Sequence, residues 1–279
     1  MSNQPTALNQ PLRDLDAWAA HFRQAEIPVL ASTAEALEAL RANEDAVDAN
    51  GIGEMVSGDP LMSLKVLAYA STHRPARVIT DAETVTAALV MMGISPFFRA
   101  FGPQPSVEGH LADLPEALAG LEDVLTRAHR GANFALAFAV HRMDHDAAVI
   151  HQAALLHDFA EMLLWCHAPA LALRIRNAQR ADSTLRSRTI QQQVLNIELP
   201  DLQQALMRAW RLPELLIRIT DDKHAEQPAV RNVVLAVRLA RHTAQGWDNA
   251  ALPDDIADIA ALLNLSSEAA LHLVRGVEA

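Results

Sequence analysis

The sequence predicts an all-α protein built from two fused helical lobes. Alanine and leucine, the strongest helix formers, recur along the whole 279-residue chain. Only 10 glycines and 1 tyrosine are present, and this scarcity of glycine and aromatic residues disfavours a β-rich fold. Apolar residues make up 51% of the chain and charged residues 20%, which is typical of a globular protein with a substantial core.

Helix boundaries are indicated by capping residues and by apolar side chains at helical spacing. Asp59 is a candidate N-cap with Pro60 at the first helical position, and Ser32 followed by Glu35 has the spacing of a capping box. Gly93 is placed to end a helix. The predicted helices cover residues 15–25, 61–68, 84–92, 118–141, 146–166, 169–180, 189–194, 200–210, 213–224, 229–244, 253–263 and 267–274.

A short segment divides the predicted helices into two groups. Residues 102–106 (GPQPS) hold two prolines and a glycine, which disfavour helix, so we place the lobe boundary there. The predicted organisation is then a leader and peripheral helix (1–26), an N-terminal helical lobe (27–105), and a second helical lobe with a C-terminal extension (106–279).

The charge balance disfavours nucleic acid as the partner. The formal net charge is −11, whereas proteins that grip the nucleic-acid backbone usually present a basic face. The nearest approach to such a face is a run of arginines within residues 174–188, which we interpret as the solvated surface of a helix and the loop after it.

Cysteine usage and hydropathy favour a cytoplasmic protein. Cys166 is the only cysteine, so no intramolecular disulfide can form, and we expect a buried, inert thiol. Residues 1–13 lack the layout of a signal peptide. Polar residues interrupt the longest apolar stretch, residues 153–165, so we expect no membrane span there.

A His-Asp pair lies inside that apolar stretch and is the strongest candidate for chemistry. His157 and Asp158 are costly to place within a predicted helix interior unless something satisfies them. One explanation is a divalent metal, for which imidazole and carboxylate are standard ligands. The other is a buried hydrogen-bond network. The residues by themselves leave both open and favour the network.

The other histidines are weaker candidates for a metal site. His141 and His145 flank Asp144 at i and i+4, a spacing that suits a metal, but their polar neighbours indicate an exposed helix end. Four further histidines show no partner pattern, namely His110, His167, His242 and His272.

Methionine and phenylalanine are frequent in the first lobe. We expect most of them in its core, although such residues could also line a groove for a partner helix. They are Met55, Met62, Met91, Met92, Phe97, Phe98 and Phe101.

Six segments resemble, in order, the landmarks of the HDOD family, a branch of the HD-domain superfamily. The family patterns IPxLP, SDPxL, KLLxLAN, AIxxLG, AGLLHDIG and xWxLP are similar to residues 27–30 (IPVL), 57–61 (SGDPL), 64–70 (LKVLAYA), 88–93 (ALVMMG), 153–160 (AALLHDFA) and 209–213 (AWRLP). No single segment is specific, but their order is. The resemblance covers roughly residues 27–225.

The resemblance implies an all-α bundle whose second lobe is HD-domain-like. In catalytic HD enzymes, two histidines and two aspartates hold one or two metals, and a metal-bound hydroxide attacks a phosphate ester. Carried over to this chain, His157 and Asp158 match the pair that names the superfamily. His129 is the candidate for the upstream histidine, and Asp221 or Asp222 for the distant aspartate.

The departures from the family pattern indicate that the set of metal ligands is incomplete. Ala160 replaces the glycine of HDIG, and Leu199 and Gln203 stand where a histidine and a glycine are expected. A pair of histidines is replaced by residues 222–224 (DKH), and a lysine beside a metal is electrostatically unfavourable. The residues His129, His157, Asp158, Asp221 and Asp222 are therefore predicted to be vestigial, with possible metal ligation as the alternative. No catalytic residue is predicted, and no cofactor is expected unless a divalent metal is retained.

Two classes of function remain after these departures. The first is a regulatory signal-transduction module that binds a signalling protein partner, or a nucleotide in the former catalytic cleft. The alternative is a metal-dependent phosphohydrolase acting on a nucleotide or cyclic nucleotide. Residues 226–279 extend past the resemblance and could mediate a homodimer.

Overall fold

The computed structural model describes residues 7–73, 81–182 and 184–278. These residues form helices and no strand, and their one β-type pairing is an isolated parallel bridge between Val29 and Ser106. The all-α prediction is therefore confirmed. The chain packs as two compact units, one of Met1–Val124 with Asp158–Pro213 and one of Leu125–His157 with Glu214–Ala279. These units interleave along the sequence, and the predicted division at residues 102–106 stays a prediction.

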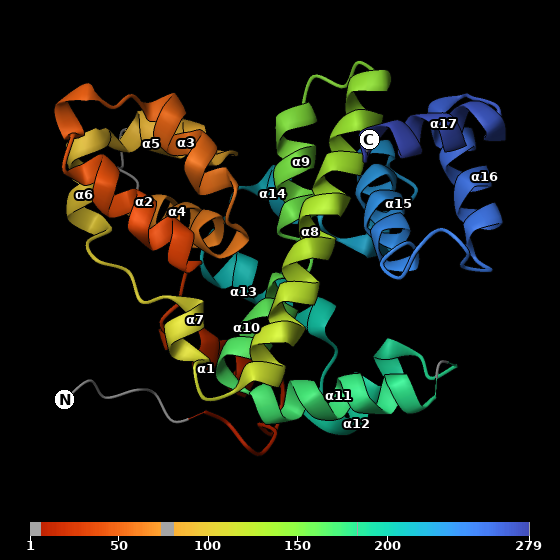
Figure 1. Ribbon diagram of the computed structural model, residues 1–279, viewed down its shortest axis with the longest axis horizontal. Helices are drawn as coiled ribbons and strands as arrows, with labels where there is room; N and C mark the ends of the chain where they lie inside the picture. The colour runs from red at the N-terminus through yellow and green to blue at the C-terminus, as the bar shows by residue number, and fades with distance from the viewer. Residues whose placement is uncertain (1–6, 74–80, 183, 279) are drawn as a thin grey trace. The chain divides into compact units, whose positions relative to one another are not determined.

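The first unit contains most of the helices of the chain (Figure 1). A long helix, α8 (Pro115–His141), begins in this unit and continues into the second. The other helices of the first unit are α1 (Leu15–Gln24), α2 (Ala31–Arg41), the 3₁₀ turn η1 (Glu44–Ala46), α3 (Ala49–Ser57), α4 (Pro60–Thr72), α5 (Val85–Met92), α6 (Ile94–Ala100), α7 (Val107–His110), α10 (Phe159–His167), α11 (Pro169–Ala181), α12 (Ser187–Leu195) and α13 (Leu199–Ala209).

Two groups of contacts organise the first unit. Helix α3 packs on α4 and α5, while α10 contacts α4, α11 and α13. The peripheral helix α1 lies on α13, where Trp18 is fully buried and its indole Nε1 donates to the carbonyl of Leu195 at 2.9 Å. Buried phenylalanines at positions 97, 98 and 101 belong to the core, as predicted, whereas Met91 is 43% exposed.

The start of α4 follows the predicted capping chemistry, and the start of α2 does not. Asp59 is fully buried, and its Oδ1 accepts from the amides of Leu61 and Met62 at 2.9 and 3.1 Å. The predicted capping box at Ser32 is wrong. Helix α2 begins at Ala31, whose amide donates to Glu108 Oε2 at 2.8 Å, so a distant carboxylate supplies the acceptor.

The second unit is arranged around α15 (Pro228–His242) (Figure 1). This helix packs against α9 (Ala147–Leu155), α14 (Glu214–Ile219), the 3₁₀ turn η2 (Asp222–His224) and α16 (Leu252–Leu263), and α16 in turn packs against α17 (Ser267–Val277). The hydrophobic stripe of α15 is buried as the sequence predicts, with Val233 and Leu239 fully covered. Residues 226–279 therefore add three helices to the core of this unit.

No single helix of the described residues is both long enough and apolar enough to cross a membrane. Helices α16 and α17 reach that length and hydropathy only in combination, and the chain bends by 98° between them.

Two glycines of α8 provide a test of the packing, because only one of them is needed for close approach. A Cβ on Gly120 would lie 2.4–2.6 Å from three ring atoms of Trp165, whereas a Cβ on Gly131 would meet nothing nearer than 3.5 Å. We expect Gly120→Ala to lower the free energy of unfolding by about 1–3 kcal/mol through this overlap. Gly131→Ala should raise it by up to about 1 kcal/mol, since alanine is the better helix former.

Chemical denaturation of both variants measures the difference. Equal effects of the two substitutions would show that the indole does not lie against α8 as described.

Candidate functional site

The His-Asp pair lies in a break between two helices. Helix α9 ends at Leu155 and α10 begins at Phe159, with a turn between them. The single predicted helix over residues 146–166 is therefore wrong in this stretch. No glycine or proline marks the break, so no residue in this stretch indicates it locally.

The structure brings His157 together with one of the two predicted distant aspartates. His157 Nε2 lies 2.8 Å from Asp222 Oδ1, and both residues belong to the second unit. The histidine side chain is 8% exposed and the aspartate 46%. The interaction satisfies a nearly buried imidazole, which is the hydrogen-bond explanation raised by the sequence.

The other two candidate aspartates, Asp221 and Asp158, are placed at the starts of helical segments. Asp221 caps η2, where its Oδ1 accepts from the amide of Lys223 at 3.2 Å. Asp158 lies in the first unit at the N-terminal end of α10, and its carbonyl accepts from the amides of Glu161 and Met162. Its carboxylate makes no capping hydrogen bond to α10.

His129 is held in a defined tautomer on α8. Its Nδ1 lies 2.8 Å from the carbonyl oxygen of Leu125, and because a carbonyl can only accept, Nδ1 carries the proton. In the neutral ring this arrangement leaves Nε2 as the acceptor. His151 on α9 is close enough that the charge of His129 lowers its pKa, although burial is the larger cause.

These residues do not fit a metal centre. Across residues 7–73, 81–182 and 184–278, no three His, Cys, Asp or Glu side chains are placed to hold one ion. A catalytic HD site needs more ligands than the paired His157 and Asp222 provide. Within the predicted set, the structure brings His157 and Asp222 together, and no reaction step through a metal can be derived.

A second group of histidines, which the sequence did not indicate, gathers in the first unit. The ring of His167 lies 5.5 Å from that of His110 and 6.3 Å from that of His21, between ring centroids. The Nε2 atoms of His21 and His167 are buried without a hydrogen-bond partner among the described residues. The backbone of His167 also holds the start of the chain, since its carbonyl accepts from the amide of Leu8 at 2.8 Å.

Burial is the main cause that lowers the pKa of His167, to about 4. The neighbouring His110 and His21 act in the same direction, whereas a hydrogen bond to the backbone of Glu26 and the charge of Glu26 oppose it. The sequence showed no partner pattern for His110 and His167 because their partners come from distant parts of the chain. At neutral pH His167 is uncharged, and the three rings join α1, α7 and α10.

Two further histidine predictions had different outcomes. His242 does have a partner, because its Nδ1 lies 2.5 Å from Asp255 Oδ2, and Arg238 binds the same carboxylate at 2.7 Å. His141 and His145 are exposed, as predicted. They do not share a helix, since α8 ends at His141.

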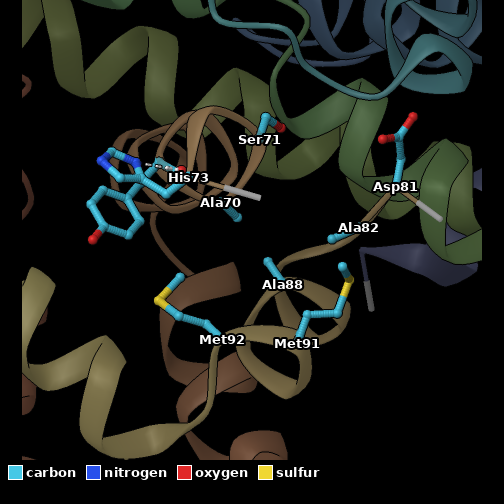
Figure 2. Close-up of a pocket in the computed structure, with 9 residues that line it drawn as sticks. Ala70, Ser71, His73, Asp81, Ala82, Ala88, Met91 and Met92 are labelled. Carbon is cyan, nitrogen blue, oxygen red and sulfur yellow. Dashed lines mark hydrogen bonds between the residues drawn. The ribbon is translucent and has the colours of Figure 1, made fainter. Parts of the chain in front are cut away.

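One small hollow lies beside α4 and α5 in the first unit (Figure 2). Figure 2 shows Ala70 and Ser71 contributed by α4, and Ala88, Met91 and Met92 by α5. The space measures about 60 Å³. Pockets for drug-sized ligands begin at roughly 300 Å³, so this hollow cannot enclose a nucleotide.

Comparison with known proteins agrees with these features. A sequence model of the HDOD domain matches residues 27–226. The MmoQ response regulator of Methylococcus capsulatus strain Bath is 18% identical, covers 89% of this chain and 98% of its own, and superposes with a TM-score of 0.65. A virulence factor of Campylobacter jejuni subsp. jejuni is 15% identical, covers 95% and 98%, and has a TM-score of 0.60. At these identities the likeness concerns the fold. No curated protein matches the chain.

The histidine cluster predicts acid sensitivity. Because the pKa of His167 is lower in the folded chain than the ordinary 6.5, the unfolded chain binds more protons, and stability falls as the pH drops from 6.5 toward 4. The contribution of His167 to the loss should approach about 3 kcal/mol at the acid end of this window. Urea denaturation of the wild type and of His167→Gln at pH 7.5 and pH 4.5 measures it.

The glutamine cannot titrate between these pH values, so the variant should lose less stability than the wild type. An identical loss in both proteins would mean that His167 is not kept neutral by burial.

The His157–Asp222 pair predicts a measurable coupling. A double-mutant cycle with His157→Ala and Asp222→Ala should give a coupling free energy of about 0.5–1 kcal/mol, at the lower end for a hydrogen bond because the carboxylate is half exposed. The matched control pairs His157→Ala with Asp221→Ala, since the Asp221 carboxylate caps η2. That cycle should give less than about 0.5 kcal/mol. Equal couplings would contradict the assigned pairing.

Proposed function

Because the chain belongs to the HDOD domain family, we propose that it is a signal-transduction module that binds a protein partner and does not hydrolyse phosphate esters. The observation that carries this proposal is the pairing of His157 with Asp222. Two residues predicted as metal ligands are hydrogen-bonded to each other at 2.8 Å. The pair thereby meets a structural need of the second unit.

The surroundings of the pair support the same proposal. Lys223 follows Asp222 directly, and an ammonium beside a metal would oppose binding of the cation. The carboxylate of Asp221 caps η2. A regulatory module tolerates these substitutions because it needs only a stable fold and a binding surface.

The comparisons are compatible with a signalling role. The MmoQ protein is named a response regulator, and this chain covers 98% of that structure with a TM-score of 0.65. The shared fold supports a scaffold of this type. The identity of the partner belongs to the surface of this chain, which is not shared at 18% identity.

One observation favours the alternative, a metal-dependent phosphohydrolase. A histidine whose Nδ1 donates to a backbone carbonyl presents Nε2 to a metal, and His129 has this arrangement. His129, His157 and Asp222 all belong to the second unit. A rearrangement that brought their donor atoms to one point would provide three ligands.

Elemental analysis of protein purified without chelators separates the two functions. We expect well under one equivalent of iron, manganese or zinc per chain, and no hydrolysis of bis(p-nitrophenyl) phosphate when each metal is added. The reason is that the described donor atoms do not converge on one ion. Stoichiometric metal that is lost in both His129→Ala and His157→Ala, together with hydrolysis, would overturn the proposal.

A further inference from the structure

Two consecutive helices of the first unit, α11 and α12, carry arginines and no acidic residue. The chain has 34 acidic residues and a net charge of −11, yet neither α11 nor α12 contains an aspartate or glutamate. Residues 174–188 hold five arginines and one aspartate. Solvated helices usually mix both signs, and a field of one sign is typical of a surface that attracts an oppositely charged partner.

The arginines of this hairpin fall into two classes. Arg176 is structural, since its guanidinium lies 5.1 Å from the ring centroid of Trp165 and donates to the carbonyl of Glu116 at 3.2 Å. Arg188 pairs with Glu198 at 2.7 Å.

The other three arginines, Arg174, Arg180 and Arg186, are exposed and make no hydrogen bond or ion pair within the described part of the chain. We call these three residues the arginine face of the hairpin: Arg174 and Arg180 belong to α11, and Arg186 directly precedes α12. Their guanidinium groups are available to a partner without breaking a contact of the fold.

The acidic residue between the two helices is already engaged in hydrogen bonds. Asp182 follows α11, and its Oδ1 accepts from the amide and the hydroxyl of Thr184 at 2.9 and 2.6 Å. Hydrogen bonds from Thr184 are the main cause that lowers the pKa of Asp182, so it remains a carboxylate engaged within the turn. Helices α11 and α12 pack against each other, which places the arginines of both on one hairpin (Figure 1).

The uncharged residues of the hairpin indicate which anion it suits. Exposed positions around the arginines carry amides and hydroxyls, among them Asn177, Ser187 and Gln192, and neither helix contains an aromatic residue. Base stacking on aromatic side chains is a main source of affinity for single strands. A long polyanion would also meet the repulsion of a chain of net charge −11. A short, carboxylate-rich segment does not depend on aromatic side chains for its affinity, and guanidinium forks bind carboxylates in a bidentate manner.

We propose that the arginine face of the α11–α12 hairpin is a docking surface for an acidic segment of a protein partner. This inference rests on the proposed regulatory function and specifies the chemistry of its partner. The segment would present at least two or three carboxylates to Arg174, Arg180 and Arg186. Its binding would weaken with salt, as expected for exposed ion pairs.

The test uses the full chain and a fluorescein-labelled decaglutamate peptide, with binding followed by fluorescence anisotropy at low ionic strength and at 150 mM salt. The variant Arg174→Gln/Arg180→Gln/Arg186→Gln removes the arginine face. The matched control Arg23→Gln/Arg99→Gln/Arg208→Gln removes three exposed arginines from elsewhere on the same unit. Both variants have the same net charge, so a difference between them reports position. Circular dichroism verifies that both remain folded.

We expect the arginine-face variant to bind the peptide about tenfold or more weakly, since three exposed pairs are lost, and the control to change binding less than about twofold. Equal weakening by both variants, or no binding by the wild type at low ionic strength, would overturn the inference. It would also be overturned if an oligonucleotide of ten residues bound more tightly than the peptide through the same arginines. None of these outcomes bears on metal content or hydrolysis, so the proposed function would fail or stand separately.

Discussion

A buried carboxylate holds together the beginning of the first unit. Asp59 is fully buried, and while its Oδ1 caps α4, its Oδ2 accepts from the amide of Leu30 at 2.8 Å, just before α2. Burial raises the pKa of Asp59, and the backbone hydrogen bonds lower it. Without these donors, a buried carboxyl would be costly in either protonation state. The segments IPVL and SGDPL, which are separated in sequence, are therefore joined by one side chain.

The sequence was sufficient to predict helix boundaries where they are determined by neighbouring residues. Asp59 and Pro60 start α4, and Gly93 follows α5 with a φ of +83°, a conformation that favours glycine. The sequence was insufficient where the partner is distant. The acceptor for the amide of Ala31 is Glu108, which no local spacing could indicate. The break at residues 156–158 is likewise unmarked by glycine or proline, since long-range packing decides it.

The same division applies to the candidate site. The His-Asp pair was evident because polar residues within an apolar stretch need a partner, and Asp222 was among the candidates for that partner. The sequence could not show that the pair lies in a turn, nor that His21, His110 and His167 meet. These three rings come from three helices, and neither periodicity nor spacing connects them. Clusters formed by tertiary contact leave no pattern in a single sequence.

The presence of the hydrogen-bonded pair His157 and Asp222 is thus a weak indicator of catalysis in this fold. Once His157 is nearly buried, removing Asp222 alone would leave a polar imidazole unsatisfied, which costs more than the hydrogen bond itself contributes. Removing both partners would cost less, but it requires two simultaneous changes. A ligand pair can therefore outlast the metal it once served, because each residue makes the loss of the other unfavourable. The distinction between a retained and a vestigial centre then depends on the remaining ligands, and here the carboxylate of Asp221 is engaged in the cap of η2.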